Sequence, residues 1–210
     1  MAKFKNKYRI ESNRLKGWNY ANSGLYFITI VTQNRVCNLG HIENNEMIKS
    51  DFGKIVNTEW FKSFEMRDEL FLHQYILMPN HIHAIVELVN NDDGGNVGNG
   101  GNVETNGRSS LPPKQPPIRQ PKSISSFIAG FKSSVNSKID DYIDVHNLNI
   151  PKYNRKNHFF QPNYHDHIIR NDKSYYNISN YIVNNPIQWT ADTFNPVKTV
   201  DLTSQKDTDK

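Results

Sequence analysis

The residues with the clearest chemical potential lie in the segment MPNHIH at positions 78–83. If this segment is extended, His81 and His83 point to one face of a strand and Ile82 points to the other. Two strand steps of about 3.3 Å place the two Cβ atoms about 6.5–7 Å apart, so both imidazoles can reach one metal ion. The alternative is that two histidines alternate by chance on a half-exposed strand. A third ligand and a reactive group nearby would favour the metal site.

A second pair of polar residues lies near the C-terminal end, in the segment NYIVNNP at 180–186. Tyr181 and Asn185 are four residues apart, so they share a helix face if the last turn forms. Pro186 makes that turn marginal and leaves the Asn185 side-chain carbonyl at the helix end, where it could bind a cation. Two imidazoles and an amide oxygen suit a hard or borderline divalent ion with positions left for phosphate oxygens. The alternative for Tyr181 is an aromatic residue at the edge of an apolar stripe.

The elements that must position these residues follow from the hydrophobic pattern. β-Branched and aromatic runs predict strands, and apolar residues spaced by three and four predict helices. The predicted strands are 25–33, 70–78, 81–89 and 164–170, and the predicted helices are 51–64, 123–139 and 172–184. Ser123 and Asp172 are the predicted N-caps of the last two helices, and Pro186 is predicted to end the last one.

The order of these elements predicts the fold class. Strand, helix, strand, strand, helix and strand match a split βαβ, or ferredoxin-like, arrangement, and one more helix follows. We therefore expect an α+β fold with a central antiparallel sheet, helices on one face, and a C-terminal helix that carries Tyr181. Such a fold does not by itself indicate a function.

The composition of the 210-residue chain indicates one domain that is interrupted by a low-complexity insertion and followed by a polar tail. The stretch 90–107 is rich in Gly and Asn, and 111–121 contains five prolines. Such stretches cannot bury enough apolar surface to offset the entropy lost on ordering. We therefore predict a flexible insertion at 90–121 within a single domain of residues 1–196, and a polar, disordered tail at 197–210.

Composition and charge also restrict the class of protein. Lys and Arg number 25 against 21 Asp and Glu, a net charge of +4, which permits nucleic acid as a partner without requiring it. Cys37 is the single cysteine, so an intrachain disulfide and a cysteine-based zinc site are excluded, and a cytoplasmic location is expected. No stretch reaches the roughly 18 apolar residues that would span a membrane, and the N-terminal segment lacks the apolar core of a secretory signal.

Two basic segments suggest contact with a polyanion. Residues 1–20 contain six Lys and Arg and one Glu, and residues 108–140 contain six Lys and Arg and one Asp. The alternative is that these lysine-rich segments are merely solvated. The candidate phosphate contacts are Arg14, Lys16, Lys132 and Arg170. Trp18 and Tyr20 could stack on unpaired bases, or they could pack in the core.

Four segments, in order, resemble the HUH single-tyrosine transposases, in which a bulky apolar residue separates two metal-binding histidines. The similarity is greatest to the REP-associated tyrosine transposases and their insertion-sequence relatives. The segments are RLKGWNYANSGLYFITIVTQNR, LMPNHIHAIV, FIAGFKSSVNSKI and FFQPNYHDHIIRNDKSYYNISNYIVNNPIQW. The resemblance runs through nearly the whole chain except for the insertion at 90–121 and the tail.

This resemblance implies a role for each matching residue. His81 and His83 match the metal-binding pair, and Tyr181 matches the nucleophile. Asn185 stands where related transposases have a glutamine as third metal ligand, and asparagine is one methylene shorter. The implied cofactor is a divalent metal ion, Mg²⁺ or Mn²⁺. The implied partner is single-stranded or hairpin DNA, bound by a monomer or a homodimer.

The function implied by the resemblance is DNA transposition, a recombination reaction in which single strands are nicked and joined near a hairpin. The tyrosine would form a 5′-phosphotyrosine intermediate and release a 3′-OH. His165 and His167 are candidate bases for the tyrosine, or they line the sheet and contact phosphate. The main alternative is a regulatory protein, derived from a transposase, that binds hairpin DNA without cutting it. A replication-initiator or relaxase nickase and an RNA-binding domain are less favoured, because their usual signatures are missing from the sequence.

Overall fold

The computed structural model describes residues 3–4, 7–8, 18–90 and 121–196. The predicted insertion lies outside the described residues except for its two ends, and the predicted tail at 197–210 lies wholly outside them. The candidate DNA contacts Arg14 and Lys16 lie outside them too. The predicted domain limits therefore stay predictions. Within the described ranges, no helix combines the length and apolarity needed to cross a membrane.

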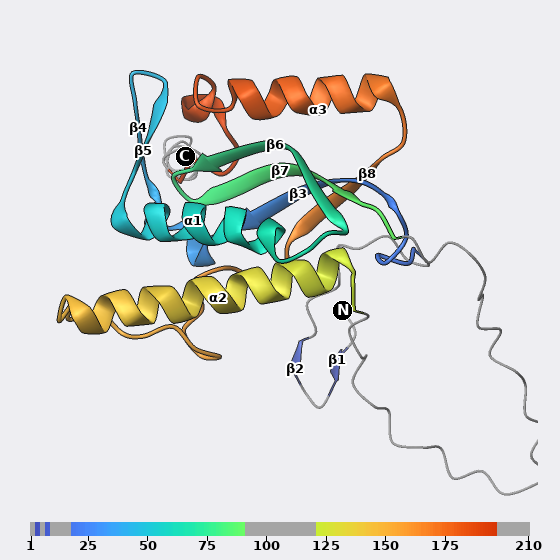
Figure 1. Cartoon of the computed structure of the whole chain (residues 1–210). Coiled ribbons are helices and arrows are strands. Elements are labelled where there is room, and N and C mark those ends of the chain that lie inside the picture. Colours follow the sequence, from blue (N-terminus) through green and yellow to red (C-terminus); the bar gives the residue numbers. More distant parts are fainter. Residues whose placement is uncertain (1–2, 5–6, 9–17, 91–120, 197–210) are drawn as a thin grey trace, which may run out of the picture.

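A four-stranded antiparallel sheet forms the centre of the molecule (Figure 1). Its strands, in spatial order, are β6 (Leu70–Met78), β7 (His81–Leu88), β3 (Gly24–Val31) and β8 (His165–Ile169). The helices are α1 (Asp51–Glu65), α2 (Ile124–Val145) and α3 (Asp172–Asn184). The connections through α1 and α2 give the split βαβ arrangement, so the predicted α+β fold with an antiparallel sheet is confirmed.

The structure also contains smaller elements. They are the paired strands β1 (Lys3–Phe4) and β2 (Lys7–Tyr8), the hairpin of β4 (Gly40–Glu43) and β5 (Glu46–Lys49), and the 3₁₀ turns η1 (Gln33–Arg35) and η2 (Trp189–Ala191). The sequence did not predict the β4–β5 hairpin. Its two-residue turn places Asn44 and Asn45 at positive φ angles of 51° and 63°, as a type I′ turn requires.

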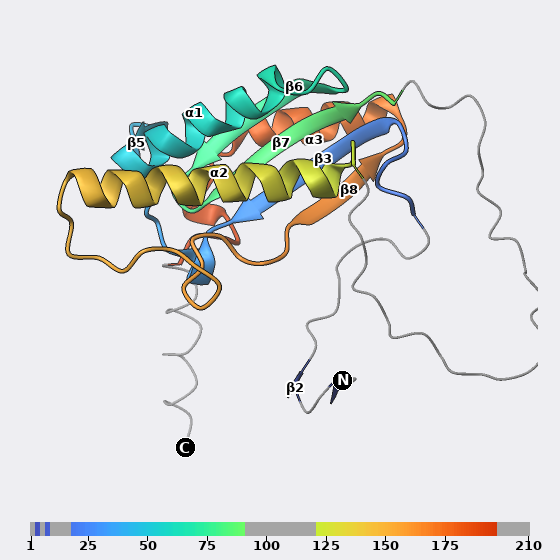
Figure 2. The same cartoon turned by 60° about the horizontal axis from the view of Figure 1, so that its bottom comes forward.

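Helices cover both faces of the sheet (Figures 1 and 2). α1 and α2 pack together against one face, and α3 lies over β6 and β7 on the other face. The predicted arrangement of helices on one face therefore holds for α1 and α2. The separate C-terminal helix that carries Tyr181 lies on the opposite face.

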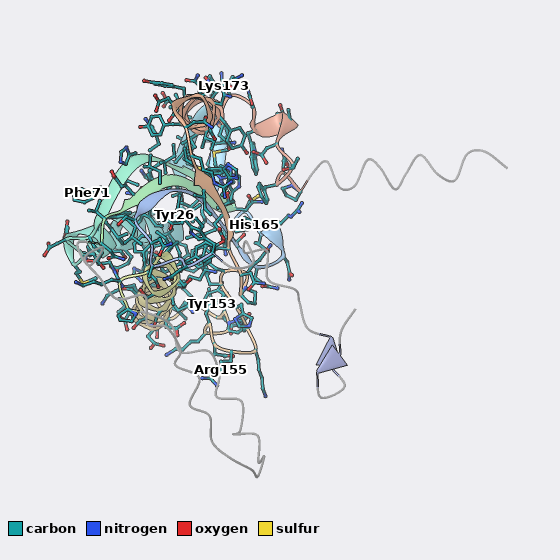
Figure 3. All side chains as sticks on the ribbon, turned by 90° about the vertical axis from the view of Figure 1, so that its right-hand side faces the viewer. Tyr26, Phe71, Tyr153, Arg155, His165 and Lys173 are labelled. Atoms are coloured by element: carbon teal, nitrogen blue, oxygen red, sulfur yellow. The ribbon has the colours of Figure 1, made fainter. Side chains whose placement is uncertain are left out.

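The main core lies between the sheet and the α1–α2 layer. Trp60 of α1 is fully buried and stacks on Tyr75 of β6, with 5.5 Å between ring centroids. Phe127 and Phe131 of α2 meet the same indole edge-on at 5.3 and 5.0 Å. Tyr26 of β3 lies on this side of the sheet, toward α2 (Figure 3). This aromatic cluster supports the sheet from one face, so the other face can carry α3.

A smaller apolar cluster holds α3 in place. Ile182 of α3 packs with Ile85 of β7 and Ile169 of β8, and all three are buried. Side chains two residues apart on a strand share a face, so Ile85 lies on the same face of β7 as His81 and His83. α3 therefore covers the histidine face of the sheet.

α3 begins and ends at residues that are typical of helix boundaries. Asn171, rather than the predicted Asp172, is the N-cap, because its side chain accepts a hydrogen bond from a backbone N–H of the first turn. Asp172 is instead the first-turn acid, where the helix dipole favours a negative charge. The helix ends at Asn184, two residues before Pro186, as predicted.

Candidate active site

The two histidines of β7 lie side by side beneath α3. His81 and His83 are fully buried, and their ring centroids are 4.4 Å apart. Ile82 between them points into the main core. The alternation of an extended strand therefore brings the two imidazoles together, as the sequence predicted.

Each imidazole has a partner for its Nδ1 atom. His81 Nδ1 lies 2.8 Å from Asn80 Oδ1, and His83 Nδ1 lies 2.8 Å from Thr29 Oγ1. When the ring hydrogen is on Nδ1, the lone pair is on Nε2. Both histidines can therefore offer Nε2 to a further partner.

Tyr181 reaches this histidine pair from α3. Its hydroxyl lies 3.1 Å from His83 Nε2, and its ring meets Phe27 of β3 edge-on at 6.2 Å. The side chain is 38% exposed, so part of the phenol is accessible to a substrate. The structure thus brings together the tyrosine and the histidines that the sequence singled out.

Asp192, which the sequence analysis did not single out, completes the cluster. It lies directly after η2 and is buried, and its carboxylate and the ring nitrogens of His81 and His83 lie within 4.8 Å of one another. Asp192 Oδ1 accepts a hydrogen bond from the backbone N–H of Phe194 at 2.6 Å, which fixes the carboxylate. The sequence feature that could have indicated Asp192 is its place as the one acidic residue between Trp189 and Phe194.

Asn185 lies beside this carboxylate. It is the C-cap of α3, it is fully buried, and its Nδ2 donates to Asp192 Oδ2 at 3.1 Å. Its Oδ1 and the Nε2 of His81 are buried and make no hydrogen bond within the described part of the chain. Buried polar atoms nearly always have a partner, so two unsatisfied acceptors in one cluster fit the ligand atoms of a metal ion.

Burial keeps both imidazoles neutral. It lowers the pKa of His81 to about 3, against a smaller opposing effect of Asn185. The pKa of His83 also lies well below its usual value, because of burial and the neighbouring His81, and Asp192 opposes this shift. The neutral imidazole is the form that binds a metal ion, so no proton has to leave either histidine first.

Tyr181 is held as a neutral phenol. Burial raises its pKa above the usual value and the Asp192 carboxylate adds to this, while Asn185 acts in the opposite direction. A positive charge placed in the cluster would favour the phenolate and shift the pKa downward.

The residues present fit a divalent metal ion. His81, His83 and Asp192 form a cluster whose ligand atoms could converge on one ion, and Asn185 Oδ1 adds an amide oxygen. Imidazole nitrogen together with carboxylate and amide oxygen is a mixed donor set for a borderline divalent ion.

Two aromatic rings and an arginine lie beside the cluster. The Phe194 ring lies 4.7 Å from the His81 ring, and the Trp189 ring lies 6.1 Å from it. The Arg35 guanidinium lies 5.4 Å from the centroid of the Phe194 ring and donates to the Thr193 carbonyl at 2.9 Å. The sequence analysis did not single out Arg35, which brings a positive charge close to the histidines.

Two of the predicted DNA contacts are not part of the cluster and lie on α2 and between β8 and α3. Lys132 is on α2, on the opposite face of the sheet, and its Nζ donates to the carbonyls of Gln161 at 2.7 Å and Asn163 at 3.1 Å. Arg170 is exposed and lies between β8 and α3. Contact of either residue with DNA stays a prediction.

The candidate bases His165 and His167 are exposed on β8. They pair in register with Thr29 and Phe27 of β3, so they lie on the α3 face of the sheet, the same face as Tyr181. Their placement agrees with a role near the site, and that role stays a prediction.

Trp18 and Tyr20 are integrated into the protein core. Tyr20 is buried, and its hydroxyl donates to Asp166 Oδ2 at 2.6 Å. Trp18 packs against the main core, and its indole N–H donates to the Tyr26 hydroxyl at 3.2 Å. Of the two alternatives left by the sequence, core packing is the one observed.

Comparison with known proteins places the chain in a family. No family model matches the sequence. A Haemophilus influenzae Rd protein, described as an uncharacterized protein, is 33% identical over 189 residues, which cover 86% of this chain and 90% of that relative. The chain belongs to the same family as this protein. The similarity extends over nearly the full length of both chains.

Two solved structures resemble the chain. A REP-associated tyrosine transposase bound to a REP hairpin has 17% sequence identity and a TM-score of 0.47, with 90% of this chain and 74% of that chain covered. A Deinococcus radiodurans R1 protein assigned as a transposase has 15% identity and a TM-score of 0.37, with 81% of this chain and 97% of that chain covered.

Proposed function

We propose that this protein is a metal-dependent single-stranded DNA endonuclease and strand transferase of the transposase type, with Tyr181 as its nucleophile. The observation that carries the proposal is the 3.1 Å distance from the Tyr181 hydroxyl to His83 Nε2, at the edge of the His81–His83–Asp192 cluster. A phenol beside neutral imidazoles and a buried carboxylate suits phosphoryl transfer through a tyrosine.

His81, His83, Asp192 and Asn185 are the residues that would hold the metal ion. When bound there, a divalent ion would neutralise charge on the scissile phosphate and favour ionisation of the nucleophile. Because Mg²⁺ prefers oxygen ligands and usually keeps several waters, the two imidazoles favour Mn²⁺ over Mg²⁺. The Tyr181 hydroxyl contacts the Nε2 of His83, which is the nitrogen that this histidine would offer to the ion.

Tyr181 performs the covalent step. Its hydroxyl gives its proton to a base, for which His165 and His167 are the candidates. Its oxygen then attacks the scissile phosphorus while the bond from phosphorus to the 3′ oxygen of the preceding nucleotide breaks, and that 3′ oxygen takes up a proton. The products are a 5′-phosphotyrosine and a free 3′-OH. A second 3′-OH then attacks the phosphotyrosine, which joins two strands and restores the phenol without ATP. A phenol with a pKa of about 10 leaves more readily than an alkoxide.

One chain supplies every part of the site. Tyr181 lies against His83 of its own chain, and Asp192 and Asn185 follow it closely in sequence. We therefore infer that a monomer can carry out the nicking step. Arg35 joins Arg170 and the other basic residues named above as a candidate phosphate contact.

Detection of a covalent protein–DNA adduct tests this proposal. A single strand that carries a hairpin is labelled at its 3′ end, incubated with the full chain and Mn²⁺, and run on a denaturing gel. We expect the label to migrate with the protein, because the 5′-phosphotyrosine retains the 3′ fragment. Chelation of the metal should abolish this band, and a strand labelled at its 5′ end should release a short free fragment.

The alternative function is a hairpin-binding regulator that does not cut. It predicts tight binding of the same strands without an adduct, in either Mg²⁺ or Mn²⁺ and with any flanking sequence. The contact between Tyr181 and His83 favours the enzyme, because binding DNA does not require a tyrosine against a buried pair of histidines.

A further inference from the structure

Asn80 lies where three segments of the candidate active site meet, and its side-chain amide contacts all three. It precedes His81 and is fully buried. Its Oδ1 is 2.8 Å from His81 Nδ1, and its Nδ2 is 2.9 Å from the Arg35 carbonyl oxygen and 2.8 Å from the Phe194 carbonyl oxygen. One amide therefore links the start of β7, the turn η1, and the segment that follows Asp192.

The two carbonyl contacts fix the orientation of this amide. Carbonyl oxygens only accept, so both must face Nδ2, which uses its two hydrogens on them. Oδ1 also only accepts, and it faces His81 Nδ1, which must therefore carry the ring hydrogen. A neutral imidazole with its hydrogen on Nδ1 has its lone pair on Nε2. The contacts around Asn80 thus select the tautomer of His81 that can ligate a metal through Nε2.

The same amide also holds the acidic residue of the site. The Phe194 carbonyl accepts from Asn80, while the Phe194 N–H donates to Asp192 Oδ1 at 2.6 Å. The Phe194 ring packs against His81 at 4.7 Å. A chain of hydrogen bonds therefore connects Asp192 to His81. It runs from Asp192 to the backbone of Phe194, from there to the Asn80 amide, and from this amide to His81.

We propose that Asn80 is a positioning residue that sets the tautomer of His81 and holds Asp192 beside it. This inference rests on the proposed metal centre and not on DNA cleavage. Groups that hydrogen-bond to the distal nitrogen of a metal-ligating histidine orient the ring, and their loss typically weakens metal binding 10–100-fold. Thr29 Oγ1 lies 2.8 Å from His83 Nδ1, but a hydroxyl can donate or accept, so this contact does not select a tautomer of His83.

Two substitutions separate the two roles of Asn80. Asn80→Leu keeps the branched shape and removes both the acceptor for His81 and the donors to the Arg35 and Phe194 carbonyls. Asn80→Asp keeps an acceptor for His81 Nδ1–H, but it removes the donors and adds a negative charge. Comparison of the two variants therefore distinguishes control of the tautomer from the link to Asp192.

Asn90 provides a matched control. It follows the opposite end of β7, and its Nδ2 also donates to two backbone carbonyls, those of Ala21 and Lys122. Asn90→Asp removes two comparable donors far from the histidines. It should therefore report the cost of losing such contacts without any effect on the site.

The first readout is the tautomer of His81 in the metal-free full chain, measured by long-range ¹H–¹⁵N correlation of the imidazoles at pH 8. We expect hydrogen on Nδ1 in the wild type, Asn80→Asp and Asn90→Asp, and a mixture of tautomers in Asn80→Leu. Hydrogen on Nε2 in the wild type would overturn the proposal even if Asn80→Leu fails to fold. An unchanged tautomer in folded Asn80→Leu would also overturn it.

The second readout is Mn²⁺ affinity by calorimetry, without DNA. We expect binding to Asn80→Leu to be weaker by about 10–100-fold, and binding to Asn90→Asp to be unchanged. Asp192→Asn should cost about tenfold or more in the wild-type background and much less in the Asn80→Asp background, because the two residues are coupled. The proposal would be contradicted if Asp192→Asn cost the same in both backgrounds, or if Asn80→Leu bound Mn²⁺ as tightly as the wild type. It would also be contradicted if the wild type did not bind Mn²⁺. DNA cleavage is judged separately, by the adduct.

Discussion

Tyr181 and Tyr175 lie on the same helix, and the hydroxyl of each faces a histidine. The Tyr181 hydroxyl is 3.1 Å from His83 Nε2 in the buried cluster, whereas the Tyr175 hydroxyl is 3.4 Å from His73 Nδ1 at an exposed position. We predict that Tyr181→Phe abolishes the covalent adduct and leaves binding of the hairpin strand within about twofold, since only the attacking oxygen is lost. Tyr175→Phe should retain the adduct. An adduct that persists in Tyr181→Phe would place the nucleophile elsewhere.

The histidine pair gives a second prediction at the scale of residues. His81→Ala should slow adduct formation about a thousandfold or more, on the order of 4 kcal/mol in the barrier, because a proposed metal ligand is lost. His73→Ala is the control. His73 Nε2 lies 2.7 Å from Glu87 Oε2, and neither residue belongs to the cluster. The measurement is a single-turnover rate at saturating Mn²⁺. A near-normal rate in His81→Ala would remove the metal assignment.

Part of this site could be predicted from local sequence and part could not. His81 and His83 share a face because any strand alternates its side chains, and Tyr181 and Asn185 are neighbours because they are one helical turn apart. Asp192 follows no such rule. Its sequence neighbourhood resembles that of a surface acid, and it becomes buried only because the chain after α3 folds back over β7.

At the scale of elements, α3 must hold Tyr181 against the sheet, and Ile182 is the side chain that anchors it. Ile182 is 1% exposed, whereas the adjacent Val183 is 60% exposed. We predict that Ile182→Ala lowers the free energy of unfolding by about 2–5 kcal/mol, while Val183→Ala changes it by less than about 0.5 kcal/mol. Denaturant titration measures both. Equal effects of the two variants would show that α3 does not dock through Ile182.

The element boundaries show where sequence patterns suffice. β6 and α3 match their predicted ranges because strong apolar patterns end at Pro79 and Pro186. α2 runs past its predicted end at 139 to Val145, because Ile143 continues the buried stripe through an acidic stretch. The β4–β5 hairpin was missed because each strand has four residues and neither contains a fully buried side chain. Short, half-exposed strands give little periodic signal.

At the scale of the whole molecule, the buried histidines make stability depend on pH. The pKa of His81 is about 3 in the folded chain, and that of His83 is also lowered, against about 6.5 when unfolded. Below pH 6.5 the unfolded chain therefore binds protons that the folded chain does not. The free energy of unfolding should fall as pH drops from 6.5 toward 3, by on the order of 1 kcal/mol per pH unit for each histidine.

Denaturant titration of the metal-free chain between pH 7.5 and 5 measures this dependence. His81→Gln removes one of the two groups, so its free energy of unfolding should fall less steeply with acid than that of the wild type. Identical slopes for the two proteins would contradict the burial of a neutral His81.

The proposed contact with DNA would involve the whole molecule, because the candidate basic residues are spread over several segments. If about six phosphates are neutralised, the logarithm of the binding constant should fall with the logarithm of salt concentration with a slope of roughly −4. Arg35→Ala should reduce this slope by about 0.7, as expected for one phosphate contact. Fluorescence anisotropy with a labelled hairpin strand measures both, and salt-independent binding would contradict an electrostatic interface.

The position of the covalent bond tests the central claim most directly. After reaction with the hairpin strand in Mn²⁺, the protein is digested with nuclease and protease, and the peptides are analysed by mass spectrometry. We predict a 5′-phosphonucleotide on Tyr181. A nucleotide on any other residue, or no modified peptide when the strand is bound, would contradict the account.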